Sequence, residues 1–549
     1  MLSGLHFPLM SSNPNIFLSK VVLLKQSPVH LASQTQRLLK PLAIATAVLA
    51  LSACTTIAPK PLTADELSPA NQTDRLAMRK DVEAITAPLS MDEAIARALK
   101  YNLDRRAKMM EEALAFNQLD VTQFDMLPKL VAQAGYSNRS EERATFSSSY
   151  VDPVVGPKSS TSSLSQERNR NTVELGLTWN LLDFGLGHYG ASQQANRVMI
   201  AAEKRRKAMH LLMQDVRTAY WRAASAQKLR TDVASAIALA EEALSDSSKV
   251  EAERLRNPLD ALRYQRQLLE NLRLLEAIDQ ELSSAQVELA SLINAPIGQV
   301  IQIAETDVKN VGAGVLKVAV QAMEEAALAQ NADLREQHYN ARIARDETRR
   351  TMVRLFPNVS FSYGIKYDSD RYMVHNNWNE AGVQMSFNLF NVLTGPTQIK
   401  LAEAGVALAD QRRMATQLAV LTQVHLARLQ LLNARSQFDR ADTIYATDLK
   451  IAEHVRNRAS VQAQSKLDSV SNATAAILSL LRRYQALAQV QSAENRLFAT
   501  MGLEPKIGST SELTLAQLTA QLKSNGTLWA GVHNSASLLP VAEKPAASK

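Results

Sequence analysis

Cysteine, aromatic residues and helix breakers are scarce in this sequence. Cys54 is the single cysteine among 549 residues, so neither an internal disulfide nor a cysteine-based zinc site can form within one chain. Aromatic residues make up 5%, and Gly and Pro number 18 each, while hydrophobic residues reach 46%. The few breakers and the abundant Ala, Leu, Gln and Arg predict long helices.

The basic excess does not indicate a nucleic-acid-binding protein. The formal charge is +7, but the first 53 residues hold four cations and no acid, and without them it would fall from +7 to +3. No dense basic tract interleaved with aromatic residues occurs elsewhere. No histidine pair has metal-ligand spacing with a nearby carboxylate, and neither a Gly-rich phosphate loop nor a Ser-His-Asp order is present. We therefore expect no enzyme activity, no cofactor, no metal site and no nucleic-acid partner.

The N-terminal region has the pattern of an export signal. Arg37 and Lys40 precede an apolar run at 42–51, which is followed by Ser52, Ala53 and Cys54. A charged segment, a short apolar core and small residues are typical of a signal peptide. The run of about 10 apolar residues is too short to span a bilayer as a helix, and no other segment offers the ~18 consecutive apolar residues that spanning needs.

An internal repeat organises the rest of the chain. Ala98–Asn102 recurs as Ala327–Asn331, 229 positions later, whereas Trp179–Leu181 recurs as Phe387–Leu389 at an offset of 208. The first copy therefore carries a longer insert. We predict five parts. Residues 1–53 form a signal peptide with a non-mature extension, and residues 54–88, with four prolines, form a tether expected to be extended. The two repeats span 89–300 and 315–503, and residues 504–549 form a peripheral or disordered tail.

Four segments alternate apolar with polar or small residues. Such period-two patterns over about 10 residues are typical of membrane β-strands, although an ordinary half-buried sheet is the alternative. The predicted strands lie at about 129–138, 172–182, 358–367 and 380–390. The linkers 138–171 and 368–379 are expected to be exposed hairpin loops. Aromatic residues near the strand ends are interpreted as lipid-facing or interface-belt residues: Trp179, Phe184, Phe387 and Phe390.

Two long stretches contain neither Gly nor Pro, at 191–257 and 406–501. A helix of about 65 residues would be close to 100 Å long, so such helices must pack along one another as coiled coils or bundles. Tyr220 and Trp221 are interpreted as bundle packing, and Arg205–Lys207 as a solvated helix face. Four strands cannot close a barrel, because single-chain barrels start at about eight strands. If the strands lie in a membrane, the chain must therefore oligomerise.

Together these features resemble the TolC-type outer-membrane factors. The resemblance covers roughly Pro88 to Gly502 and rests on two copies of helix, hairpin and long helix pair, on Leu127-Pro128 at strand entry, and on the Asn-Leu-Leu-Asp-Phe-Gly element that begins at Asn180. Leu-Ser-Ala-Cys resembles the lipobox of bacterial lipoproteins, which implies that Cys54 is acylated with palmitate and anchors the chain in the outer membrane.

The resemblance implies a mainly α fold with a small β part. Three chains would each contribute four strands to a 12-stranded membrane barrel, which continues as a long α-helical coiled-coil barrel into the periplasm. The homotrimer would be a passive, gated duct in the cell outer membrane, opened by a periplasmic adaptor and driven by an inner-membrane pump. The substrate stays open among drugs, metal ions, other small molecules and proteins.

The turns between the long helices and their partners are candidate gate positions. In the TolC-type family, acids just after this turn help to form the periplasmic constriction, and Asp260 and Asp468 match that position. Helix capping is the alternative explanation for both acids. The adaptor-facing tip candidates are Leu255, Asn257, Pro258, Ala463 and Ser465. Leu255 and Ala463 replace the usual glycine of the family pattern.

A lipid-tethered periplasmic coiled-coil scaffold without a pore is the competing function. It accounts for the long helices. It does not account for the four alternating segments at matched positions in the two repeats.

Overall fold

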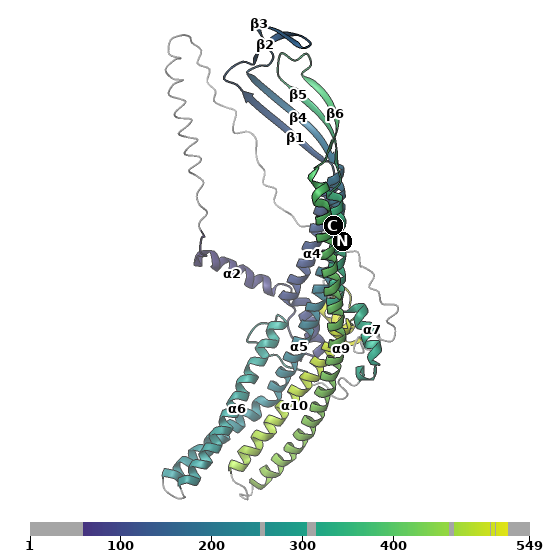
Figure 1. Cartoon of the computed structure of the whole chain (residues 1–549). Helices are drawn as coiled ribbons and strands as arrows, with labels where there is room; N and C mark the ends of the chain where they lie inside the picture. The colour runs from purple at the N-terminus through teal and green to yellow at the C-terminus, as the bar shows by residue number, and fades with distance from the viewer. Residues whose placement is uncertain are drawn as a thin grey trace, which may run out of the picture. The chain divides into compact units, whose positions relative to one another are not determined.

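The structure is a computed structural model that describes residues 59–252, 258–304, 314–459, 466–505, 507–510 and 512–524. The chain divides into two compact units, Met1–Leu76 and Ala77–Lys549. The described residues are mainly helical, with six strands in two small sheets. Figure 1 shows the elements with their labels.

The described part of the first unit contains most of helix α2 (Ala64–Arg79), so the prediction of an extended tether is wrong for these residues. The helix begins at a capping box: Thr63 N donates to Glu66 Oε2 at 3.2 Å, and Glu66 N donates to Thr63 Oγ1 at 3.4 Å. Asp65 and Glu66 lie in the first turn, where carboxylates favour a helix. The helix continues through Pro69, which cannot donate a backbone hydrogen bond to the preceding turn.

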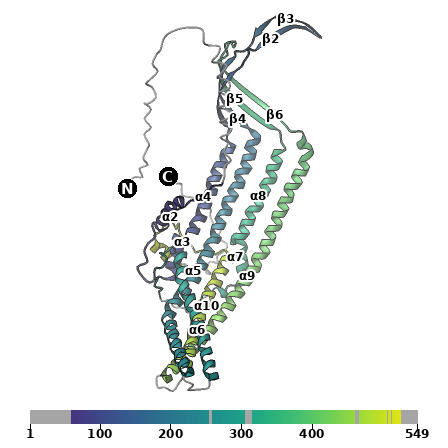
Figure 2. The ribbon, with the colours of Figure 1, turned by 90° about the vertical axis from the view of Figure 1, so that its left-hand side faces the viewer.

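In the second unit, four helices form a layer in the order α4, α5, α8, α9, since each contacts the next. Figure 2 shows this layer side by side. α5 has 72 residues and is therefore about 108 Å long. The helices of this unit and its two 3-10 turns are α3 (Met91–Tyr101), α4 (Leu103–Gln123), η1 (Phe124–Met126), α5 (Leu181–Ala252), α6 (Pro258–Leu292), η2 (Val315–Lys317), α7 (Val320–Gln330), α8 (Ala332–Arg354), α9 (Phe390–Ala459), α10 (Lys466–Met501) and α11 (Leu515–Ser524).

Two asparagines connect the short helices to the long ones in the same way. Asn102 lies between α3 and α4; its Oδ1 accepts from Arg105 N at 3.0 Å and its Nδ2 donates to Leu292 O at 3.1 Å. Asn331 lies between α7 and α8; its Oδ1 accepts from Leu334 N at 3.0 Å and its Nδ2 donates to Thr500 O at 2.9 Å. Each amide therefore caps one helix and binds the C-terminal end of another.

The larger sheet is antiparallel and has the strand order β1-β4-β5-β6. Its strands are β1 (Lys129–Asn138), β4 (Asn169–Asn180), β5 (Asn358–Asp368) and β6 (Asn377–Ser386). The predicted strands overlap all four, but two of them were extended too far. Asn180 Nδ2 donates to Asp183 Oδ2 at 2.9 Å, and Phe390 N donates to Asn388 Oδ1 at 3.1 Å. Asparagine therefore marks the change from strand to helix at both places.

The predicted hairpin loops are more ordered than expected. The Ser-rich segment contains a second antiparallel sheet of β2 (Ala144–Val151) and β3 (Val154–Leu164), so its prediction as a loop is wrong. Thr, Val, Phe and Tyr supply β-forming residues in these two strands, without clear alternation. In the segment after β5, Asp370 is 3% exposed and its Oδ1 accepts from Tyr372 N at 3.1 Å. This turn is therefore fixed by buried hydrogen bonds.

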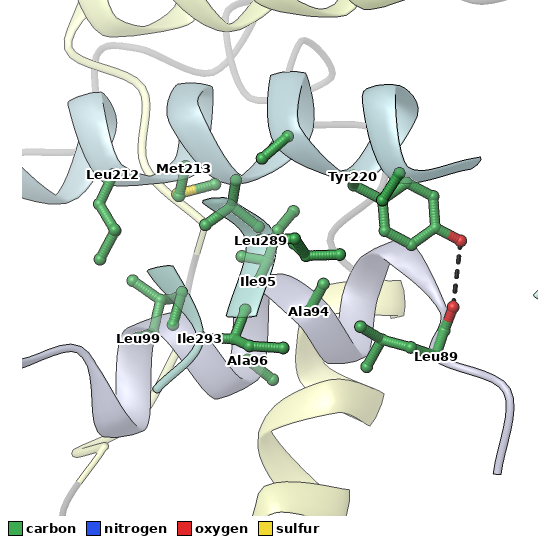
Figure 3. Packing of buried hydrophobic residues seen from close by; sticks show 14 of the residues in the cluster. Leu89, Ala94, Ile95, Ala96, Leu99, Leu212, Met213, Tyr220, Leu289 and Ile293 are labelled. Carbon is green, nitrogen blue, oxygen red and sulfur yellow. Dashed lines mark hydrogen bonds between the residues drawn. The ribbon is translucent and has the colours of Figure 1, made fainter. Parts of the chain in front are cut away.

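The main core of the second unit lies where α3, α5, α6, α10 and α11 meet, and we call it the belt core. It includes Leu89, Ile95, Leu99, Met213, Tyr220, Trp221, Leu289, Ile293, Leu487 and Leu518. Figure 3 shows Tyr220 reaching Leu89, and its hydroxyl donates to Leu89 O at 3.2 Å. The interpretation of Tyr220 and Trp221 as packing residues is confirmed.

The segment after Gly502 also contributes to the belt core. Leu515, Leu518 and Leu522 of α11 are buried in it, and Lys100 Nζ donates to Leu513 O at 2.6 Å. The expectation of a peripheral or disordered tail is therefore wrong for the described residues up to 524. The apolar spacing of 515, 518 and 522 places one side of a short helix on α3.

Candidate functional site: sheet faces, sheet edges and helix tips

One face of the larger sheet is apolar across all four strands. The register places Leu130 opposite Leu177, Leu177 opposite Tyr363, and Tyr363 opposite Ala381. A neighbouring row joins Leu175 to Ile365. These side chains are exposed rather than covered by another element, with Leu130 at 67% and Val383 at 71%. An exposed apolar face of this size is unusual on a soluble surface and suits contact with lipid or with another chain.

The opposite face carries small and polar side chains. Glu174, Lys366 and Ser362 lie on it, together with Gly176 and Gly364. Lys366 Nζ lies 3.6 Å from Glu174 Oε1 on β4 and 3.0 Å from Glu380 Oε2 on β6. One face therefore suits an apolar environment and the other suits water, which is the pattern of strands in a membrane barrel.

The sheet has two edges that no described strand covers, because β1 and β6 are the outer strands of the order. The helix layer has matching edges, since α4 leads into β1 and α9 follows β6. Both edge helices expose apolar residues: Leu103, Met110, Leu114 and Val121 on α4, and Leu401, Leu408, Leu418, Leu426 and Leu429 on α9. Strand edges and apolar helix stripes therefore run along the same two sides of the unit.

Aromatic side chains gather where the sheet meets the helices. The ring of Trp179 lies 5.9 Å from that of Phe184 and 6.1 Å from that of Phe361, measured between centroids. Phe387 and Phe390 are exposed. Aromatic rings at one level of a strand region are typical of membrane interfaces, and this assignment for the four predicted aromatics stays an interpretation.

The two candidate gate acids lie in the first turns of α6 and α10. Figure 1 shows these helix starts at the end of the unit opposite the sheet. Asp260 Oδ1 lies 3.9 Å from Arg263 NH1 on the same helix, and its side chain is mostly exposed. Asn271 Nδ2 donates to Ser471 Oγ at 3.1 Å, which joins α6 to α10 one to three turns beyond the acids Asp260 and Asp468.

Several predicted residues fall outside what the structure describes. Cys54 lies outside the described residues, as do Leu255, Asn257, Ala463 and Ser465. Pro258 is the first residue of α6. Within the described ranges, no helix combines the length and apolarity needed to cross a membrane. The same ranges contain no group of three or more His, Cys, Asp and Glu side chains able to hold a metal.

A buried ion cluster beside the belt core was missed in the sequence. Glu203 is 3% exposed; Arg206 bonds Glu203 and Glu504, and Arg335 Nε lies 2.6 Å from Glu203 Oε1. Arg206 also donates to Gly502 O at 3.2 Å. The prediction that Arg205–Lys207 is a solvated face is therefore wrong for Arg206. Apart from Glu203, its partners come from two distant segments, around Gln330 and at Gly502 and Glu504, so local sequence gives no sign of them.

Burial shifts titration next to this cluster. Burial lowers the pKa of His210 to about 4, with Arg206 and Arg217 acting in the same direction against Glu504. Burial also raises the pKa of Glu494, which Arg217 partly offsets. The helical body thus holds a neutral histidine and a destabilised carboxylate at ordinary pH.

The fold is shared with solved outer-membrane channels. No family model and no curated protein sequence matches the chain. Solved structures do match it, at TM-scores of 0.58 and below. A membrane protein from Pseudomonas aeruginosa is similar at a TM-score of 0.58 and 16% identity, over 77% of this chain and 92% of that chain.

Two further solved structures that match are outer membrane channels. The CmeC outer membrane channel of Campylobacter jejuni has a TM-score of 0.57 and 11% identity, over 86% of this chain and 94% of that chain. The open MtrE outer membrane channel of Neisseria gonorrhoeae has a TM-score of 0.53 and 15% identity, over 74% and 88%. At these identities the similarity defines the fold, and the predicted family resemblance is confirmed at that level.

Proposed function

We propose that the chain is the outer-membrane channel of a tripartite efflux or export system. The observation that carries this proposal is the four-stranded sheet with one exposed apolar face, one polar face and two uncovered edges. The similarity to outer membrane channels supports it. The channel is a passive duct without enzymatic activity, and its substrate class stays open among drugs, metal ions, other small molecules and proteins.

Closure of the sheet requires further copies of the chain. An open strand edge in lipid leaves backbone N–H and C=O groups unpaired, each at several kcal/mol. Pairing β6 of one copy with β1 of the next removes both edges, and the same rotation brings the apolar stripe of α9 against that of α4. We propose a homotrimer with a 12-stranded barrel that continues as a helical coiled-coil barrel. This contact is heterologous, with β6 of one copy against β1 of the next, and heterologous contacts form a ring when the rotation between copies closes.

We also propose that the chain consists of two structural repeats. The order short helix, helix, strand, strand, long helix, helix occurs twice, with β2 and β3 added only to the first copy. The equivalent roles of Asn102 and Asn331 support this division. The proposed repeats span about 89–300 and 315–503, as the sequence predicts. Helix α11 follows the second repeat and packs in the belt core.

The remaining assignments concern the two ends of the duct. Cys54 is the proposed site of lipid attachment after removal of residues 1–53, and residues 54–88 join it to the body. Asp260 and Asp468 are proposed at the periplasmic gate, because they begin α6 and α10 at the end opposite the sheet. The proposed adaptor-facing residues are Leu255, Asn257, Pro258, Ala463 and Ser465, and the inner-membrane pump would supply the energy.

Cysteine accessibility tests the pore directly. Cys54 is the only native cysteine, so an introduced thiol can be followed by itself. A Cβ at Gly176 would lie 3.6 Å from Glu174 Oε1, which is ordinary contact, so Gly176→Cys fits the polar face. Leu175→Cys, the next residue, lies on the apolar face and is the matched control. Both variants are reconstituted in planar bilayers and treated with a charged, water-soluble methanethiosulfonate.

We expect the reagent to reduce conductance through Gly176→Cys and to leave Leu175→Cys unchanged, because only the first thiol faces a water-filled bore. Equal modification of both thiols would show a sheet in water rather than in lipid. If the parent protein forms no channels, the pore is rejected and the lipid-tethered scaffold becomes the better function.

A further inference from the structure

Three charged side chains from neighbouring strands meet on the polar face of the sheet. Glu174 of β4 lies directly opposite Lys366 of β5 in the register, and Glu380 of β6 lies diagonal to it. Lys366 Nζ contacts both carboxylates, at 3.6 Å and 3.0 Å. We call Glu174, Lys366 and Glu380 the Lys366 cluster.

Two glycines give this cluster its position against the sheet. Gly176 and Gly364 are paired on the same face, beside Glu174 and Lys366. A Cβ added at Gly364 would lie 3.4 Å from Glu174 Oε1 and 3.5 Å from Lys366 Cε, so both charged side chains occupy the space above this glycine. The Glu174 carboxylate and the stem of Lys366 therefore lie close to the backbone of the sheet.

The Lys366 cluster has an uneven charge. Elsewhere near this sheet, charges pair one to one: Lys129 Nζ lies 3.6 Å from Asp183 Oδ2, and Arg170 NH1 lies 3.5 Å from Asp368 Oδ2. The Lys366 cluster instead holds two carboxylates and one ammonium, which leaves a net negative charge in each copy. Because all three side chains lie on the polar face of the sheet, this charge acts on solutes rather than on lipid.

Resting on the proposed function, we infer that the Lys366 cluster is a charge filter in the strand section of the bore that favours cations and cationic solutes over anions. Symmetry places one copy from each chain at the same level of the barrel. Like charges around a narrow aqueous passage attract counter-ions and repel co-ions. This filter lies at the other end of the unit from Asp260 and Asp468, so the two sets of acids can be tested separately.

The test measures reversal potentials of single channels under a KCl gradient in planar bilayers. Lys366→Gln leaves two carboxylates and should raise the cation-to-anion permeability ratio. The double variant Glu174→Gln/Glu380→Gln leaves one ammonium and should lower it. With three copies about 10 Å from the axis in about 0.1 M salt, each unit of charge should change the ratio by roughly three- to fivefold. Ser362→Ala, a neutral change on the same face, is the control and should have no effect.

The series is repeated in an Asp260→Asn/Asp468→Asn background, which removes the acids at the helix tips. An ordered change of selectivity with cluster charge in both backgrounds supports the inference. Unchanged selectivity in Lys366→Gln and in the double variant, with conductance intact, overturns it while the proposed channel stands. Failure of the unmodified protein to form any channel would instead reject the proposed function.

Discussion

The belt core and the sheet place their apolar residues in opposite environments. In the belt core, Tyr220 is fully buried and its hydroxyl is bonded to Leu89 O. In the sheet, Leu175 is 43% exposed, although it belongs to a continuous apolar face. A single chain can thus bury its helical interior by itself, whereas its sheet leaves apolar surface and two strand edges that no described element covers.

This comparison predicts where a mutation acts. Changes in the belt core and its ion cluster should alter the stability of each chain. Changes in the sheet should instead alter insertion and assembly while the helical body stays folded. The following predictions run from the largest expected effect to the smallest.

Arg206→Met should destabilise the helical body most. The change removes the donor from Glu203, Glu504 and two backbone carbonyls; Glu203 keeps its ion pair with Arg335, whereas Glu504 loses its arginine in a largely buried site. Breaking a buried ion pair in this way costs about 3–5 kcal/mol. Urea unfolding of the detergent-solubilised protein, followed by circular dichroism, measures the loss.

Lys207→Met is the matched control, because Lys207 pairs with Asp333 at 2.8 Å but both side chains are largely exposed. Exposed pairs contribute about 0–1 kcal/mol. Equal losses of unfolding free energy in the two variants would show that the buried ion pairs of Arg206 contribute no more stability than the exposed pair of Lys207 and Asp333.

The helical body should also become less stable in acid, because protonation of His210 favours the unfolded chain. Burial lowers the pKa of His210 to about 4 in the folded chain, against an ordinary value of 6.5. The unfolded chain therefore binds the proton first, and stability present above pH 6.5 is lost as the pH falls toward 4. The loss approaches about 3 kcal/mol.

The contribution of His210 is isolated by comparison with His210→Met. Glu494, whose pKa is raised by burial, is common to both proteins, so its contribution cancels in the comparison. The difference in unfolding free energy between the two proteins should therefore change across this pH range. A constant difference between their pH profiles would show that His210 is not the group responsible.

The sequence predicts most of the fold because its signals are local. The four strands alternate over their whole length, and the absence of Gly and Pro marks most of each long helix, although α5 and α9 begin before these stretches, at Leu181 and Phe390. The predicted strands run two residues past β4 and four past β6, because Asn180 and Asn388 turn the chain into a helix while the alternation continues past them. The β2–β3 hairpin was missed because its Ser-rich strands show no apolar period.

The candidate site is less predictable from the sequence, since its contacts join distant segments. Asp260 and Asp468 could be found from their positions after the turns. The Lys366 cluster needs the register of three strands, and Arg206 needs partners contributed by separate segments. A search for opposite charges at the polar positions of paired strands could have found Glu174 and Lys366, but only once the pairing was known.

On the sheet side of the comparison, Leu175→Arg should impair membrane insertion. A charge on the lipid face costs about 2 kcal/mol when it lies well inside the bilayer. Gln133→Arg is the matched control, because Gln133 pairs with Glu174 on the polar face, where an arginine would meet water and a carboxylate. Urea-dependent folding into lipid vesicles measures insertion, and circular dichroism should show that the helices stay folded in both.

Equal insertion of Leu175→Arg and Gln133→Arg would contradict the assignment of the two faces. Loss of helical structure in Leu175→Arg would contradict the separation between the sheet and the belt. Only a selective loss of insertion agrees with a sheet that depends on lipid and a body that does not.

The smallest stability effect is expected at the helix tips, from Asp260→Asn. Asp260 lies in the first turn of α6 and is mostly exposed, so loss of its charge should cost about 0.3–1 kcal/mol. Its effect on conductance separates capping from gating, because a capping acid acts on stability alone. Asp260→Glu keeps the charge and is the control. A conductance that changes in Asp260→Asn but not in Asp260→Glu places this carboxylate at a constriction, whereas a change in stability without any change in conductance leaves it as a helix cap.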